Sequence, residues 1–218
     1  EPLADLLMNF STEPLSILAG KFVDGEKVET IDEAIAGAQD ILAERFADEA
    51  SIREELRKLA RREGKIVTVV KNAEADEKKV FEMYYEYEEP VSRVVPHRVL
   101  AMNRGEKEDI LRVGVAVQVE KATAMMERKW LPVKSSSPSI EIVRAAIADS
   151  YKRLIEPSIE REIRAELSEK AETQAIHIFS ENLRSLLLQP PIRGKMVLGL
   201  DPAYRTGCKL AVVDETGK

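Results

Sequence analysis

The sequence predicts a mainly α-helical chain that ends in a short β-hairpin. Three observations predict this class: apolar residues recur at helical spacing before Pro190, aromatic residues make up only 5% of the chain, and two β-rich runs follow Pro190. We therefore divide the chain into an elongated multi-helix region, 1–190, built on one long spine helix, and a hairpin region, 191–218.

The composition excludes several classes of protein. The 218 residues carry 33 bases and 39 acids, a net charge of -6, with the 44% hydrophobic content of an ordinary folded domain. The single Cys208 cannot form an internal disulfide, and His97 and His177 lie too far apart to complete a zinc cluster with it. No apolar run reaches the length of a membrane span, and the first residues do not resemble a signal peptide. We therefore expect a cytoplasmic protein without a cofactor.

The first helices are marked by start and stop signals. Apolar residues between 2 and 23 predict one or two short helices. Thr30 and Glu33 form the capping-box pattern T-x-x-E ahead of a helix that reaches Phe46. Ser51 and Glu54 repeat the capping pattern, and Gly64 stands where a helix C-terminal glycine belongs.

The densest basic group lies on the helix that ends before Gly64. Its members are Arg53, Arg57, Lys58, Arg61, Arg62 and Lys65. Four-residue steps place Arg53, Arg57 and Arg61 on one stripe that could meet phosphates, so Arg57, Arg61 and Arg62 are candidate nucleic-acid contacts. We favour a solvated face, because acids interleave with these bases and a nucleic-acid footprint is more one-sided.

Charge is also divided unevenly along the chain. Residues 1–50 hold 12 acids and 3 bases, a balance of -9, and residues 51–218 hold 27 acids and 30 bases, a balance of +3. The first fifty residues therefore repel nucleic acid.

The middle of the chain mixes β and α signals. Residues 65–70 are a strand or an extended connection, and 111–119 alternate like a strand. Residues 80–90 fit a helix that stops at Pro90. Its aromatic side chains suggest base stacking, but the glutamates around them would repel a phosphate chain, so we assign them to core or helix contacts. Further helices are predicted over 97–109, interrupted near Gly105, and over 139–155, preceded by Trp130 as a hydrophobic plug.

The spine helix is predicted over 157–188. Its apolar residues step by fours, and the wet side offers the four-spaced pairs Glu160 with Arg164 and Glu166 with Lys170. A coiled-coil dimer is conceivable, but a four-residue step drifts around a helix, so we prefer an intramolecular spine that packs along something equally long.

The final residues predict two strands, 196–201 and 208–214, joined by a tight turn that carries Arg205. A strand that ends in Asp201 followed by such a turn is typical of the opening hairpin of an RNase H-like fold. Metal-dependent nucleases place a metal-binding aspartate there, and ATPases of the actin or sugar-kinase class bring the turn near a phosphate. Arg205 and Lys209 are therefore candidate phosphate contacts, and no Walker A loop occurs in the chain.

Four segments in order resemble the Tex family of bacterial transcription accessory proteins. They are GAQDILAE at 37–44, HRVLAMNRGEKE at 97–108, the helix PSIEREIRAELSEKAETQAIHIFSENLRSLLLQPP at 157–191, and the hairpin GLDPAYRTGCKLAVVDETGK at 199–218. The resemblance implies a cytoplasmic RNA-binding transcription factor with a helical region, a YqgF-like domain, helix-hairpin-helix elements and an S1 domain. This chain would be an internal fragment that carries the helical region and the first YqgF hairpin.

The resemblance leaves two functions open. The first is a helical scaffold whose parent binds RNA, or DNA, through other domains and contacts the transcription machinery. The second is part of a resolvase-like nuclease in which Asp201 is the first metal ligand. Asp201 has only Asp214 near it in sequence, and related resolvases have glycine where Ala203 stands, so we expect this chain to lack a complete active site. An ATPase is a third reading that rests on the hairpin alone.

Overall fold

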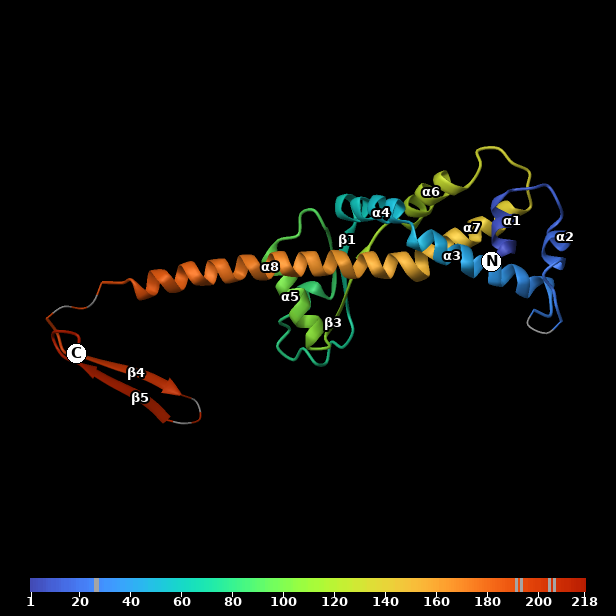
Figure 1. Ribbon diagram of the computed structural model, residues 1–218. Helices are drawn as coiled ribbons and strands as arrows, with labels where there is room; N and C mark the ends of the chain where they lie inside the picture. The colour runs from blue at the N-terminus through green and yellow to red at the C-terminus, as the bar shows by residue number, and fades with distance from the viewer. Residues whose placement is uncertain (26–27, 191, 193, 204, 206) are drawn as a thin grey trace. The chain divides into compact units, whose positions relative to one another are not determined.

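A computed structural model describes residues 1–25, 28–190, 192, 194–203, 205 and 207–218. The chain divides into two compact units, Glu1–Thr173 and Gln174–Lys218, and the division falls inside the long helix α8. Figure 1 shows the order of the elements along the chain. The prediction of a mainly α protein with a long helix and a C-terminal hairpin is confirmed.

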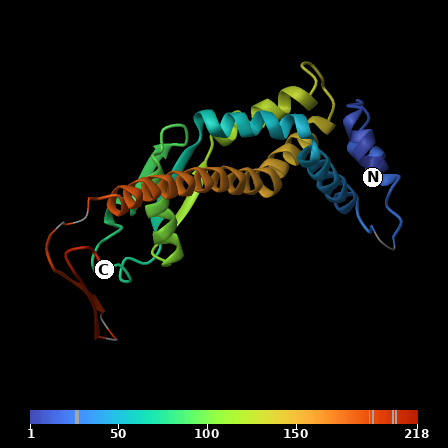
Figure 2. The same cartoon turned by 60° about the vertical axis from the view of Figure 1, so that its left-hand side comes forward.

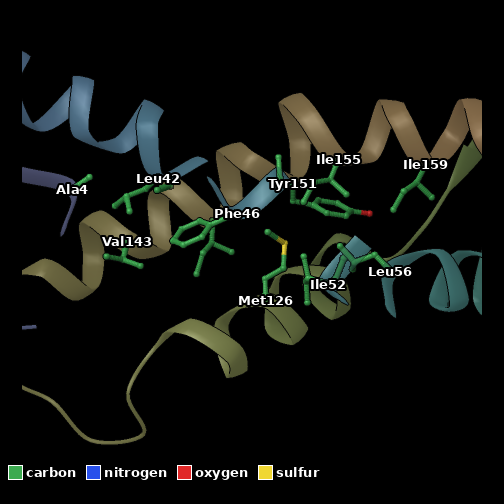
Figure 3. Packing of buried hydrophobic residues seen from close by; sticks show 14 of the residues in the cluster. Ala4, Leu42, Phe46, Ile52, Leu56, Met126, Val143, Tyr151, Ile155 and Ile159 are labelled. Carbon is green, nitrogen blue, oxygen red and sulfur yellow. The ribbon is translucent and has the colours of Figure 1, made fainter. Parts of the chain in front are cut away.

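A helical cluster makes up most of the first unit. Its elements are α1 (Pro2–Met8), α2 (Leu15–Gly20), α3 (Ile31–Asp48), α4 (Ala50–Glu63), α6 (Val119–Trp130) and α7 (Ser139–Asp149), joined by the first residues of α8. Figure 3 shows Leu42, Phe46, Met126 and Val143 in their common core. The Trp130 ring packs 4.3 Å from that of Phe46, which confirms its role as a hydrophobic plug.

The capping signals are partly confirmed. At the start of α3, the Thr30 hydroxyl accepts from the Glu33 amide and the Glu33 carboxylate accepts from the Thr30 amide, so the capping box forms. The second capping prediction is wrong, because α4 begins one residue before Ser51 and its N-cap residue is Glu49. Gly64 does end α4, where its amide donates to the Ala60 carbonyl.

A three-stranded antiparallel sheet follows α4, in the order β2-β1-β3. Its strands are β1 (Lys65–Val70), β2 (Glu86–Pro90) and β3 (Leu111–Ala116). The prediction of a helix over 80–90 is wrong: a short 3-10 turn, η1 (Glu82–Tyr84), leads into β2 instead. The tertiary partner decides this outcome, because β2 pairs along β1 with Thr68 opposite Tyr87. Phe81 and Tyr84 are nevertheless core residues, as predicted.

Helix α5 (Pro96–Lys107) covers one face of this sheet. The predicted interruption near Gly105 is absent from α5, which continues through that residue. A Cβ on Gly105 would lie 2.6 Å from the Leu111 side chain, so the missing side chain lets the helix approach β3. The strand prediction for 65–70 and 111–119 is confirmed, with β3 ending at Ala116.

Helix α8 (Glu156–Leu187) continues α7 through a π-helical turn, η2 (Ser150–Ile155), and together they make one helix of 49 residues. Two separate helices were predicted, divided at Pro157. Proline has no amide hydrogen and crowds the carbonyl four residues earlier, and the wider π turn ahead of Pro157 relieves that conflict without breaking the helix.

The hairpin β4 (Val197–Ala203) and β5 (Gly207–Val213) lies in the second unit. Leu198 pairs with Val212 and Leu200 with Leu210, so the four side chains share one face, and all are exposed. The Cys208 thiol is exposed, because nothing covers its strand in the part of the chain described. Across that same part, no helix is both long enough and apolar enough to cross a bilayer.

Candidate functional site

The basic stripe of α4 lies along the first part of α8. The two helices run side by side in both views of the ribbon (Figures 1 and 2). Arg53 donates to the Ser158 hydroxyl at 2.6 Å and contacts the Glu162 carboxylate at 3.4 Å. Arg57 donates to the same carboxylate, so one acid serves two arginines one helical turn apart.

The next turn repeats the arrangement. Arg61 donates to Glu166 through two nitrogens, at 3.0 and 2.6 Å, in a bidentate pair. The predicted pairing of Glu166 with Lys170 is therefore replaced by a bond to another helix. The same holds for Arg164, which pairs with Glu106 of α5 instead of Glu160. Arg164 also donates to the carbonyl of Val113 in β3.

These pairs shift the pKa values of their members. Hydrogen bonding to Arg57 holds the pKa of the Glu162 carboxyl below its ordinary value, although burial acts in the opposite direction. The same bond raises the pKa of Arg57, and the bond to Glu166 raises that of Arg61. These guanidinium groups stabilise helix packing, so the stripe is a helix–helix contact where we expected a solvated face.

Arg62 points elsewhere. Its side chain is 74% exposed and donates to the neighbouring Glu63 at 3.1 and 2.7 Å. Of the three α4 candidates for nucleic-acid contact, Arg62 is the one free to meet a large ligand without breaking a bond between helices.

The remaining candidates lie on the hairpin. Asp201 and Lys209 face each other across β4 and β5, and Arg205 lies in the turn; all three are exposed. Among the residues that the structure describes, no three His, Cys, Asp or Glu side chains are grouped to hold a metal ion. The structure thus brings Asp201 beside Lys209, and the described residues do not gather a three-ligand metal site around it.

Sequence reasoning missed the acidic partners of the arginine stripe. Glu162 and Glu166 are spaced by four residues, as are Arg57 and Arg61, and this matched spacing is the signal that could have found them. The pairs themselves join residues 105 positions apart, and the spacing within one helix had paired Glu166 with Lys170 instead.

These features define a mainly helical protein that carries the basic stripe of α4 on a contact between helices and has a β-hairpin in its second unit. The model of the Tex central region-like family matches residues 11–179, and that of the Tex protein YqgF-like domain matches residues 195–218. The chain belongs to the Tex family. The predicted boundary at 190 falls between the two matched segments.

Individual relatives agree with this assignment. The chain is 56% identical over its whole length to protein YdcI of Bacillus subtilis (strain 168) and 32% identical to the transcriptional accessory protein Tex of Neisseria gonorrhoeae. It is 33% identical, over 94% of its length, to S1 RNA-binding domain-containing protein 1 of Pongo abelii. The chain spans 31%, 29% and 22% of these three relatives.

Proposed function

We propose that this chain is the helical scaffold of an RNA-binding transcription accessory factor, and that the main RNA contacts are made outside residues 1–218. One observation carries the proposal: Arg53, Arg57 and Arg61 are bound to acids of α8, so they hold two helices together. The names of the relatives support the transcription and RNA-binding parts of it.

The overall charge also supports a scaffold whose main RNA contacts lie outside residues 1–218. Binding to a phosphate backbone depends on cations that can neutralise phosphates and release counterions. Here the net charge is -6, the first fifty residues carry -9, and the α4 arginines would have to leave carboxylates before they met a phosphate. A cytoplasmic location and contact with the transcription machinery belong to this proposal.

A titration of the 218-residue chain tests the scaffold function. Fluorescence anisotropy with single-stranded RNA, single-stranded DNA and duplex DNA is measured at about 50 and about 200 mM salt, a range over which phosphate contacts lose most of their affinity. We expect no salt-dependent binding. Binding that weakens with salt and falls in Arg62→Ala would contradict the proposal, since Arg62 is exposed and takes no part in the α4–α8 contact.

We also propose that the chain has no enzymatic activity of its own. A two-metal site needs carboxylates gathered from several elements, whereas Asp201 lies opposite Lys209. The match of 195–218 to a YqgF-like domain keeps a nuclease open for a longer protein that completes this domain. Magnesium-dependent cleavage of branched or single-stranded nucleic acid by such a protein, lost in Asp201→Asn, would establish that second function.

A further inference from the structure

A small cavity lies where β3, α4 and the start of α8 meet. Its volume is about 10 Å³, and its lining includes Val115, Tyr151, Glu156 and Glu160. This is room for about one water-sized group. Three of these residues, Val115, Glu156 and Glu160, also line a much larger groove of about 330 Å³ on the neighbouring sheet face. The two carboxylates therefore stand between an open groove and a small chamber.

Tyr151 supplies a polar group to this chamber. The residue is 2% exposed, and Figure 3 shows its hydroxyl directed along α8 toward Ile159 and Leu56, two other residues of the lining. Within the described part of the chain, this hydroxyl has no hydrogen-bond partner. The hydroxyl keeps some exposure to solvent, so it can donate to or accept from a group that enters the chamber.

Glu156 and Glu160 are half-buried, and the described residues provide neither with a hydrogen bond or an ion pair. Burial and the charge of Glu160 raise the pKa of Glu156, and nearby Lys152 only partly opposes them. Gly114 of β3 makes room for this arrangement, because a Cβ there would lie 3.0 Å from the Glu160 carboxylate. Two carboxylates are thus held at a half-buried site that Lys152 balances only in part.

The groove beyond them has an apolar floor and one basic residue. Val67 and Val69 of β1 lie opposite Gly114 and Arg112 of β3, so the four residues share one face of the sheet. The Arg112 side chain is exposed and has no partner among the described residues. It stands two residues from Gly114, about 7 Å along the strand, so the groove is acidic at one place and basic at another.

We propose that this groove binds an extended protein segment that inserts a lysine side chain, with its ammonium group between Tyr151, Glu156 and Glu160. A methylene stem suits the valine floor, and an ammonium group is compact enough for a water-sized chamber, whereas a planar guanidinium is not. Such a cation would give the two carboxylates and the hydroxyl the partners that they lack.

The groove also indicates which residue of the bound segment should lie near the lysine. In an extended peptide, side chains two positions apart point the same way and lie about 7 Å apart, which matches the separation of Gly114 and Arg112. An acidic residue two positions from the lysine would therefore reach Arg112. Arg112 also disfavours a free polyamine, whose further charges it would repel, so we assign the site to a polypeptide.

A peptide titration tests this assignment. The probe is a fluorescein-labelled peptide of alternating valines that contains Lys-Val-Glu, and its partners contain Arg-Val-Glu or Gln-Val-Glu. We expect the lysine peptide to bind the 218-residue chain at least tenfold more tightly than either partner. Glu160→Gln should remove most of this affinity, and Tyr151→Phe, which keeps the buried ring, should reduce it several-fold.

Two further variants separate binding from folding. Glu169→Gln removes a charge from an exposed position of α8 that has no ion pair among the described residues, and should bind like the parent. Gly114→Ala changes no charge but displaces the Glu160 carboxylate, and should weaken binding while the circular dichroism melt stays unchanged. Equal binding of the arginine peptide, no effect of Glu160→Gln, or binding of spermidine but of no peptide would each overturn the proposal.

Discussion

The two halves of α8 carry one sequence pattern and have opposite environments. In the packed half, residues 156–173, Ile159, Ile163 and Ala171 are buried. In the open half, residues 174–187, the side chain of Phe179 is 66% exposed and that of Leu187 is 75% exposed. We had predicted that the four-residue step would pack along its whole length, and for the open half this is wrong.

Helix geometry explains the difference. An α-helix turns 100° per residue, so each four-residue step moves the apolar stripe by about 40° around the helix. Over five such steps, an ideal helix moves its apolar stripe by about 200°, more than half a turn. A regular apolar spacing thus shows that a segment is helical, but it does not show that one neighbour can cover the segment from end to end.

The largest loss of stability should come from shortening a buried side chain in the packed half. Ile163 is 1% exposed within the main core, so Ile163→Ala should lower the free energy of unfolding by about 3 kcal/mol, through lost burial and a residual cavity. Urea unfolding followed by circular dichroism measures this loss. A change below about 1 kcal/mol would mean that the packed half is not part of the cooperative core.

A smaller loss is expected at the acid that serves two arginines. Glu162→Gln leaves Arg53 and Arg57 without their carboxylate and should cost about 1 kcal/mol at neutral pH, since all three side chains are only partly buried. The neutral variant of an exposed acid in the same half, Glu169→Gln, is the matched control and should change little.

Acidification tests the same residue in the unchanged chain. The folded pKa of Glu162 lies below its ordinary value of 4.5. The stabilisation is therefore fully present above pH 4.5 and is lost as the pH falls through the folded pKa. In unfolding curves at pH 7 and below 4.5, Glu162→Gln should lose less stability on acidification than the parent does. Equal losses would contradict the assigned role.

The Arg61–Glu166 pair should contribute less again. Both side chains are nearly half exposed, and exposed pairs contribute about 0.2–1 kcal/mol, so we expect about 0.5 kcal/mol for Arg61→Ala. Arg61→Lys keeps the charge and loses the two-point geometry, so it should recover only part of the loss. Thermal melts at low and high salt check this, because the difference between variants should shrink as salt screens the pair.

The smallest effect is expected in the open half. Phe179→Ala removes a large apolar side chain, yet the free energy of unfolding should change by less than about 0.5 kcal/mol because water already covers most of that ring. Urea unfolding followed by circular dichroism measures this change as well. A loss comparable to that of Ile163→Ala would show that the open half is buried in solution, for example against a second copy of the chain.

Local sequence signals correctly predicted helix ends that depend on hydrogen bonds between residues close in the chain. The capping box at Thr30 formed, and Gly64 ended α4. The helix prediction for 80–90 was wrong because the structure of this segment depends on β1, a strand that ends more than fifteen residues before β2 begins. Their spacing allows a helix, but pairing with β1 supplies backbone hydrogen bonds that an isolated reading of the segment cannot anticipate.

Sites were harder to predict than elements for the same reason. The sequence identified Arg57 and Arg61 as a stripe, but their partners Glu162 and Glu166 are 105 residues away. Likewise, nothing near Tyr151 in the sequence indicates that its hydroxyl shares a cavity with Val115. The roles proposed for Arg62, Asp201, Arg205 and Lys209 remain predictions.

The π-helical turn at 150–155 has a consequence for how this chain can change length. Because that turn is wider than its neighbours, it sets the rotational phase with which Ile159 and Ile163 meet the core. A π turn holds one residue more than an α turn for nearly the same rotation, so deleting one residue there can restore regular α geometry and keep both isoleucines facing the core. A deletion from the regular helix just after it would instead rotate the residues that follow by about 100°. The π-helical segment is therefore a place where this long helix can lose one residue without turning its buried face away from the core.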